Sequence, residues 1–126
     1  LSREDYYRTL LPWIYTEQEF QGAISYEDAV RRLAADPQFQ EPEAYDRQVH
    51  AALHFSSRKR LGSVSCPTLL IFGEDDLLTP MRFARSLSSG IPRSRLVVLA
   101  GAGHGLLRTR PTEVGSLVHG FLSESP

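Results

Sequence analysis

Two groups of polar residues lie where apolar segments of the sequence end, and their side chains are suited to acid–base chemistry. Glu74, Asp75 and Asp76 follow the apolar run 68–72, and His104 lies in a glycine-rich turn 28 residues after Asp76. A carboxylate beside an imidazole fixes the tautomer of the ring and stabilises the imidazolium that forms when histidine takes a proton from a nucleophile. The spacing therefore predicts an acid–base pair, provided that the fold brings the two segments together.

The segments that carry these residues have the pattern of parallel strands. Residues 68–72 are a short, unbroken apolar run, which is typical of a strand buried on both faces between layers of helices. Residues 95–99 predict a second strand, which leads into the turn 101–105. Open parallel sheets place their chemistry in the loops beyond the carboxyl ends of the strands. We therefore expect Asp76 and His104 to lie side by side above the sheet.

Two helices are expected to accompany these strands. Thr79 is predicted to cap a helix that has Pro80 at its first position and ends near Gly90. A last helix opens at Arg110-Pro111, and its apolar residues recur at i, i+3, i+4, i+7 and i+8. The order strand, helix, strand, helix implies parallel strands joined by a right-handed crossover, so the predicted fold class is α/β.

The pattern of apolar residues changes near residue 60, and the pattern of residues 1–60 predicts helices. Ser2 opens a capped helix in which Pro12 is expected to cause a break or a kink. A second helix is predicted to begin near Ser25 and to stop at Asp36-Pro37. We expect these helices to form a covering layer, a lid, with little independent core, and residues 61–126 to form the part with the strands.

A third helix of the lid is predicted to begin near Glu41-Pro42. It carries Tyr45, Val49, Ala52 and Leu53 on one stripe. The cations Arg58-Lys59-Arg60 are expected at its end, where they would oppose the negative pole of the helix dipole.

The composition excludes several classes of protein. The chain has 126 residues, is 41% hydrophobic and carries a formal net charge of -1, which favours a globular domain and argues against a nucleic-acid partner. No apolar run is long enough to suggest a membrane span. A single cysteine, Cys66, removes any intramolecular disulfide framework, and we expect it to be a small core residue. We expect a cytoplasmic location.

In combination, these segments resemble the α/β-hydrolase superfamily. Residues 67–80 look like its acid-bearing strand and loop, in which an apolar strand is followed by Gly, two residues, the catalytic Asp, three residues and Pro. Counting back from Pro80 assigns the acid to Asp76 rather than Asp75. Residues 91–104 resemble the segment that ends in the catalytic histidine, here His104, and the last helix resembles the closing helix of the family. The opening Leu10-Leu11-Pro12-Trp13 and the run up to Arg60-Leu61 resemble lid segments of 3-oxoadipate enol-lactonase-like hydrolases.

The sequence departs from this family in lacking its nucleophile. The family places a serine in Gly-x-Ser-x-Gly at a strand-to-helix turn, in the order Ser, Asp, His, and residues 1–126 contain no such motif. The nearest approach, Gly62-Ser63-Val64-Ser65, fails on spacing and position. We therefore expect the C-terminal half of a hydrolase that cleaves an ester or lactone by a Ser-His-Asp mechanism. The N-terminal half would supply the serine, and the chain alone would be inactive.

Other functions stay open at this point. Relatives of the fold also act as haloperoxidases, dehalogenases or epoxide hydrolases. A non-catalytic fragment or interaction module is a further possibility. An unrelated two-strand binding domain is another, and it would leave Asp76 and His104 far apart. Because a two-stranded sheet is poorly stable, we expect the strand 68–72 to neighbour another strand, and the isolated chain to self-associate.

The remaining candidate residues belong to the lid. Trp13, Tyr15 and Phe20 are candidates for lining an apolar substrate pocket, and packing of the lid helices is an equally good explanation for them. His50 and His54 stand one helical turn apart and could face one metal ion, but no third ligand supports this. No metal or organic cofactor is implied.

Overall fold

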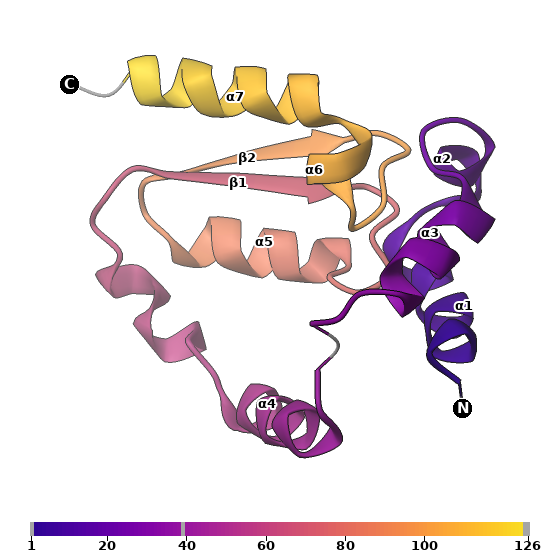
Figure 1. The fold of residues 1–126 in the computed structure, drawn as a ribbon. Helices are drawn as coiled ribbons and strands as arrows, with labels where there is room; N and C mark the ends of the chain where they lie inside the picture. Colours follow the sequence, from indigo (N-terminus) through magenta and orange to yellow (C-terminus); the bar gives the residue numbers. More distant parts are fainter. Residues whose placement is uncertain (1, 39, 125–126) are drawn as a thin grey trace.

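The computed structural model describes residues 2–38 and 40–124, and its centre is a parallel pair of strands. β1 pairs with β2 in a register that runs from Thr68 opposite Ser94 to Gly73 opposite Leu99. Helix α5 lies on one face of this sheet and α7 on the other (Figure 1). The elements in chain order are α1 (Arg3–Ile14), α2 (Glu17–Gln21), α3 (Tyr26–Ala34), α4 (Pro42–His54), the 3₁₀ helix η1 (Arg58–Ser63), β1 (Thr68–Gly73), α5 (Met81–Gly90), β2 (Ser94–Leu99), α6 (Leu106–Thr109) and α7 (Pro111–Ser123).

The predicted α/β fold with parallel strands is confirmed, with differences at the level of single residues. The core of the sheet contains Leu99, Ala102 and Val114. Apart from Gly73, the residues of β1 are half-buried rather than fully buried, because β2 is the only neighbouring strand among residues 2–38 and 40–124. Cys66 is exposed in the connection before β1, so its predicted place in the core is wrong.

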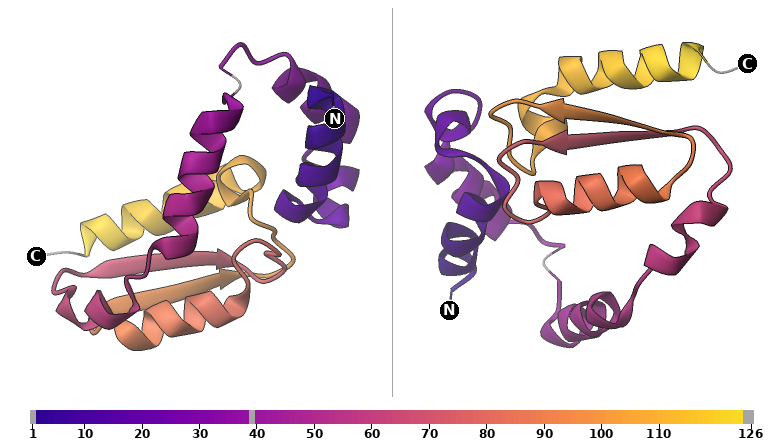
Figure 2. Two further views of the ribbon diagram at one scale, coloured as in Figure 1. Left: turned by 90° about the horizontal axis from the view of Figure 1, so that it is seen from below. Right: turned by 180° about the vertical axis from the view of Figure 1, so that it is seen from behind.

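Helices α1 to α3 form a group with a core of its own, which corrects the expectation that the lid has little independent core. Leu11, Ile24, Ala29 and Val30 are buried together, and the rings of Tyr15, Phe20 and Tyr26 pack around them. The group lies beyond the carboxyl ends of both strands in every view (Figures 1 and 2). It therefore borders the loops in which Asp76 and His104 were expected.

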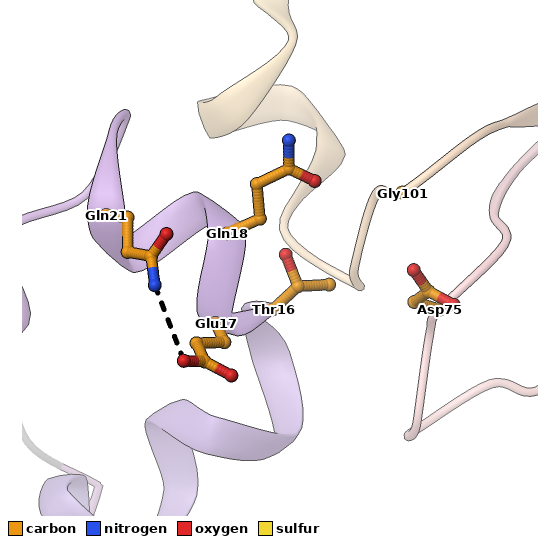
Figure 3. Close-up of a pocket in the computed structure, with 6 residues that line it drawn as sticks. All are labelled: Thr16, Glu17, Gln18, Gln21, Asp75 and Gly101. Carbon is orange, nitrogen blue, oxygen red and sulfur yellow. Dashed lines mark hydrogen bonds between the residues drawn. The ribbon is translucent and has the colours of Figure 1, made fainter.

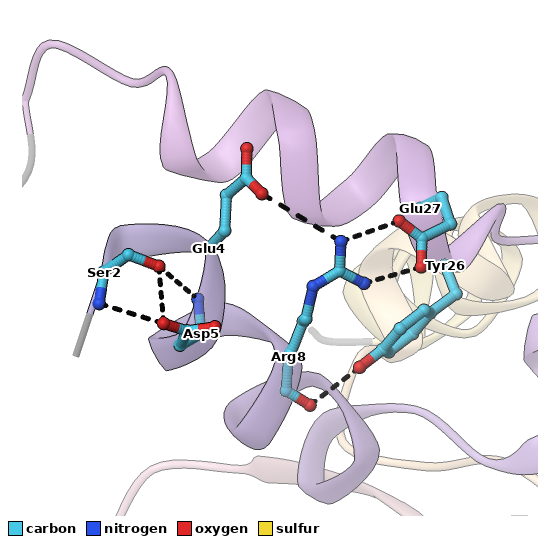
Figure 4. A network of polar contacts seen from close by, with 6 residues as sticks. All are labelled: Ser2, Glu4, Asp5, Arg8, Tyr26 and Glu27. Carbon is cyan, nitrogen blue, oxygen red and sulfur yellow. Dashed lines mark hydrogen bonds and ion pairs between the residues drawn. The ribbon is translucent and has the colours of Figure 1, made fainter.

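Pro12 neither breaks nor ends α1 before Ile14, and a hydrogen bond explains why it is tolerated. Proline lacks the N–H that would donate to the carbonyl of residue 8 in a regular helix. In this structure the hydroxyl of Tyr26 donates to that carbonyl, that of Arg8, at 2.8 Å. The Arg8 guanidinium also makes two hydrogen bonds to Glu27, at 2.6 and 2.9 Å, so α3 is tied to α1 through both the carbonyl and the side chain of Arg8 (Figure 4). The start of α1 is the predicted capping box between Ser2 and Asp5.

One further expectation for residues 1–60 is corrected. The cations 58–60 do not end α4, because Phe55 adopts an extended conformation after His54 and residues 58–63 turn into η1. The apolar stripe of α4 is largely exposed, and none of its residues is buried.

Within the described part of the chain, every helix is too short or too polar to cross a membrane. The predicted division at residue 60 falls inside η1, and it stays a prediction.

Candidate active site

Asp76 lies in the turn after β1, and its carboxylate accepts three hydrogen bonds and contacts the ring of His104. The side chain is buried, with the residue 6% exposed. Oδ1 accepts the backbone N–H groups of Leu78 at 2.9 Å and of Thr79 at 2.8 Å. Oδ2 accepts the Thr79 hydroxyl at 2.5 Å and lies 2.9 Å from Nδ1 of His104. Both oxygens are thus occupied, and the carboxylate has a fixed orientation toward the ring.

These donors explain how a buried carboxylate stays ionised. Burial favours the neutral acid, but the hydrogen bonds from Thr79 and His104 together outweigh it, so the pKa of Asp76 lies below its ordinary value. The Thr79 hydroxyl serves this carboxylate instead of capping the next helix. As a result α5 begins at Met81 after Pro80, one residue later than predicted, and lacks a side-chain cap.

His104 lies in the loop after β2 and turns one ring nitrogen to the acid and the other side to open space. Its side chain is 43% exposed. Nδ1 contacts Asp76 and also lies 3.4 Å from the Thr79 hydroxyl. In the described part of the chain no hydrogen bond reaches Nε2. With its proton on Nδ1, the ring would present a free acceptor at Nε2, which is the state that a general base needs.

The two loops meet because β1 and β2 end at the same level. Beyond the last paired residues, the N–H of Glu74 donates to Leu99 O at 3.0 Å, and that of Asp75 donates to Ala102 O at 3.0 Å. A Cβ atom on Gly73 would lie 2.3 Å from Ala102 O, so only glycine allows this approach. The expected proximity of Asp76 and His104 is confirmed. It contradicts the alternative of an unrelated two-strand domain, which would keep them apart.

Neighbouring acids do not share this role in the structure. The carboxylate of Glu74 accepts the N–H of Gly101 at 3.3 Å. Asp75 is exposed and points to an open pocket of about 410 Å³ between α2 and the histidine loop (Figure 3). The residues that line this pocket are Thr16, Glu17, Gln18, Gln21, Asp75 and Gly101.

A second cavity, of about 490 Å³, opens beside His104 over the sheet and is mainly apolar. It has room for an acyl chain or for another segment of protein. Its lining consists of Leu69, Ile71, Val114, Val118 and residues 104–108.

The three aromatic candidates do not all line one pocket: Trp13 and Tyr15 share one, and Phe20 is not part of its lining. Trp13 is 54% exposed and lines an open pocket with Asp75 and Leu77. Tyr15 and Phe20 pack edge to face in the core of α1 to α3, with ring centroids 5.8 Å apart. Tyr15 also covers Gly105, where a Cβ atom would lie 2.1 Å from its ring. A role of these residues in substrate binding stays a prediction.

His50 and His54 lie on α4, and their rings stack with centroids 4.1 Å apart. Nδ1 of His54 lies 2.7 Å from the carbonyl of His50. Among residues 2–38 and 40–124, no three His, Cys, Asp or Glu side chains are grouped so that they could hold a metal ion. The pair therefore offers no complete ligand set.

Glu19 is a buried residue near the site that the sequence reasoning missed. It is 6% exposed, and its carboxylate accepts hydrogen bonds from Thr16, Gly103 and Thr109. Thr16 and Glu19 form a capping box at the start of α2. The pattern Thr-x-x-Glu would have revealed that short helix, but not the bond to the histidine loop.

Comparison with known proteins identifies the family. The family model described as TAP-like protein, Abhydrolase_4, matches residues 38–125. "Putative carbamate hydrolase RutD" of Pseudomonas syringae pv. syringae (strain B728a) is 35% identical over 80 residues, which are 64% of this chain and 31% of that protein. "AB hydrolase superfamily protein YisY" of Bacillus subtilis (strain 168) is 38% identical over 64 residues, which are 51% of this chain and 24% of that protein.

Solved structures agree over the whole length of the chain. MGS-M2, an α/β hydrolase enzyme from a Medee basin deep-sea metagenome library, has a TM-score of 0.81 at 26% identity, covering 99% of this chain and 46% of that one. Rv0554 from Mycobacterium tuberculosis has a TM-score of 0.84 at 20% identity, covering 100% and 46%, a likeness of fold alone. The chain thus spans about a quarter to a third of these curated relatives and just under half of these structures. Its architecture is a partial α/β-hydrolase fold, and the chain belongs to the α/β-hydrolase family of TAP-like proteins.

Proposed function

We propose that Asp76 and His104 are the acid and the base of a Ser-His-Asp hydrolase that cleaves an ester or a lactone. The observation that carries this proposal is the 2.9 Å contact between Asp76 Oδ2 and His104 Nδ1. It joins a buried, fully hydrogen-bonded carboxylate to a ring that is open on its other side. This is the arrangement by which a carboxylate orients a catalytic imidazole.

The reaction assigns a separate task to each ring nitrogen. Nε2 of His104 takes the proton of a serine hydroxyl while the serine oxygen attacks the carbonyl carbon of the substrate. Asp76 holds the proton on Nδ1 and stabilises the imidazolium. Nε2 then returns its proton to the leaving alkoxide as the acyl-enzyme forms. Water attacks the acyl group in the second half of the reaction with the same base, which releases the acid and regenerates the serine.

The serine in this proposal comes from a segment outside residues 1–126. These residues contain no Gly-x-Ser-x-Gly, and the relatives and structures that the chain matches extend well beyond the matched region. The same segment would supply the oxyanion hole and a strand that pairs with the edge of β1 opposite β2. Alone, residues 1–126 are expected to be inactive.

The substrate is proposed from the lining of the cavity beside His104. Leu69, Ile71 and Val114 give it an apolar wall that suits the acyl part of an ester or lactone. Trp13, Tyr15 and Phe20 are proposed to belong to the lid over this substrate. A carbamate is the second candidate, because the RutD relative carries that activity in its name. The same attack on a carbonyl carbon would then expel an amine.

The test uses the full-length protein that contains these residues. We expect turnover of p-nitrophenyl acetate, and we expect His104→Ala to lower kcat at least about 100-fold by removing the general base. His119→Ala is the matched control, since His119 is exposed on α7. A fluorophosphonate probe reports the activated serine without depending on the choice of substrate.

The outcomes separate the possible readings. Labelling without ester turnover would retain the mechanism and reject the substrate, and carbamates and lactones would be assayed next. Labelling in the wild type but not in His104→Ala would support the base. If His104→Ala and His119→Ala both matched the wild type, His104 would not be the base. A wild type with neither labelling nor turnover would favour the non-catalytic module.

A further inference from the structure

The carboxylate of Glu19 is buried where the lid meets the histidine loop, and the proposed reaction does not use it. Oε2 accepts the N–H of Thr16 at 2.8 Å and that of Gly103 at 3.3 Å. Oε1 accepts the hydroxyl of Thr109, on α6, at 2.6 Å. A buried carboxylate is costly unless it is fully hydrogen-bonded, and these donors meet that requirement from three separate segments. The anion therefore holds α2, the histidine loop and α6 together.

The bonds to the lid flank His104 on both sides. Gly103, directly before it, donates its N–H to Glu19. Gly105, directly after it, donates its N–H to the carbonyl of Ile14 at 3.1 Å. The backbone on each side of the histidine is thus attached to the segment 14–19, while its side chain is attached to Asp76.

The contact is too close for any side chain on these two glycines. A Cβ atom on Gly103 would lie 2.7 Å from Ile14 O and 2.9 Å from Glu19 Oε2. On Gly105 it would lie 2.1 Å from the ring of Tyr15. The loop therefore contacts the lid through its own backbone, and the Glu19 carboxylate is the charged group in that contact.

We propose that Glu19 is a positioning residue, which sets the place of His104 by anchoring the Gly103 amide to the lid. The proposal rests on the proposed function, in which His104 is the base. It makes the docking of α1 to α3 a condition for a correctly placed base. When the lid is seated, both flanking amides are held; when it is displaced, the loop loses both anchors.

The test compares three substitutions in the full-length protein. Glu19→Met keeps the length of the side chain and removes both acceptors, leaving the Gly103 amide without its partner. Glu19→Gln is the conservative variant: its one oxygen can accept Thr16 and Gly103, while its amide donates to the Thr109 hydroxyl, which can rotate to accept. Glu17→Met is the matched control, since Glu17 is exposed two residues away and accepts a hydrogen bond from Gln21 at 3.4 Å.

Two readouts are expected to change together. In Glu19→Met, hydrogen exchange at the amides of Gly103 and Gly105 rises about 10- to 100-fold, as expected when a hydrogen bond to a charged group is lost. In the same variant kcat falls by about 10- to 100-fold while KM stays close to the wild-type value, because a displaced base affects the chemical step more than binding. Glu19→Gln retains most of the exchange protection and most of the wild-type kcat, and Glu17→Met matches the wild type in both.

Several results would overturn the proposal. These are unchanged exchange in a folded Glu19→Met protein, faster exchange with unchanged kcat, or loss in Glu19→Gln as deep as in Glu19→Met. If Glu19→Met does not fold, Thr109→Val takes its place, with Thr109→Ser as its control. Equal hydrogen exchange at the Gly103 amide in these two variants then overturns the proposal. If the wild type lacks turnover, the proposed function fails by itself, and the exchange of Gly103 still decides whether Glu19 anchors the loop.

Discussion

Replacing Asp76 with asparagine should move the ring proton of His104 from Nδ1 to Nε2 without removing any heavy atom from the site. The amide keeps one acceptor oxygen where the carboxylate has two. The backbone N–H groups of Leu78 and Thr79, at 2.9 and 2.8 Å, can only donate hydrogen bonds, so the amide oxygen must lie where Oδ1 is to accept them. The amide nitrogen then takes the place of Oδ2 and directs an N–H at Nδ1 of His104, 2.9 Å away.

This reversal disables the base. A ring that accepts a hydrogen bond at Nδ1 carries its proton on Nε2, and Nε2 can then no longer take a proton from the serine. The corresponding exchange in a Ser-His-Asp enzyme lowers kcat by about 10⁴-fold, which corresponds to about 5 kcal/mol of activation free energy. We expect the same magnitude here, with KM little changed, because the substitution leaves the cavity beside His104 as it is.

The assay is p-nitrophenyl acetate turnover by the full-length protein, combined with ¹⁵N NMR of the imidazole, which distinguishes the two tautomers. Asp75→Asn is the matched control, since Asp75 is exposed and faces the pocket beside α2. A folded Asp76→Asn protein that kept more than about a tenth of the wild-type kcat would refute the proposed role of Asp76. That role would equally be refuted if Asp75→Asn lost as much, since the working acid would then have been misidentified.

Two further predictions concern stability. The pKa of Asp76 in the folded protein lies below its ordinary value of 3.8, so its ionised form stabilises the fold above that value and the contribution disappears as the pH falls through the lower, folded pKa. Chemical denaturation should therefore show a larger gap in unfolding free energy between wild type and Asp76→Asn at pH 7 than at pH 3, and an equal gap would contradict this. Gly73→Ala places a Cβ 2.3 Å from Ala102 O and should cost about 1–3 kcal/mol. Gly115→Ala on α7, where the Cβ meets open space, should instead stabilise the protein by about 0.5–1 kcal/mol, and thermal unfolding of the two variants checks the contrast.

The strands and the acid–base pair were predictable because each depends on residues close together in the sequence. The apolar run that became β1 and the glycine after it predict the acidic loop, and the resemblance to the α/β-hydrolase motif, counted back from Pro80, selects Asp76 within that loop. His104 follows from the next strand in the same way. Because these two adjacent parallel strands end at the same level, the loops that follow them meet.

The residues that were misassigned or missed depend on contacts that the helix and turn patterns do not show. Thr79 has the pattern of a helix cap, but its hydroxyl donates instead to the buried carboxylate of Asp76, three residues earlier. Pro12 has the pattern of a helix breaker, and Tyr26 supplies the hydrogen bond that keeps its helix intact. Glu19 has the pattern of a surface helix residue until Gly103, 84 residues later, is placed against it. Local sequence carries no signal for the last two contacts, which are tertiary.

The different chain separations of these contacts imply an order of folding. The acid and the base are joined through 28 residues of one strand–helix–strand unit, whereas Glu19 meets Gly103 across 84. Closing the longer loop costs about 1 kcal/mol more chain entropy, and it requires α1 to α3 to be assembled already. We therefore expect the carboxylate and the imidazole to meet early, within their own folding unit, and helices α1 to α3 to dock afterwards against a pair that is already formed.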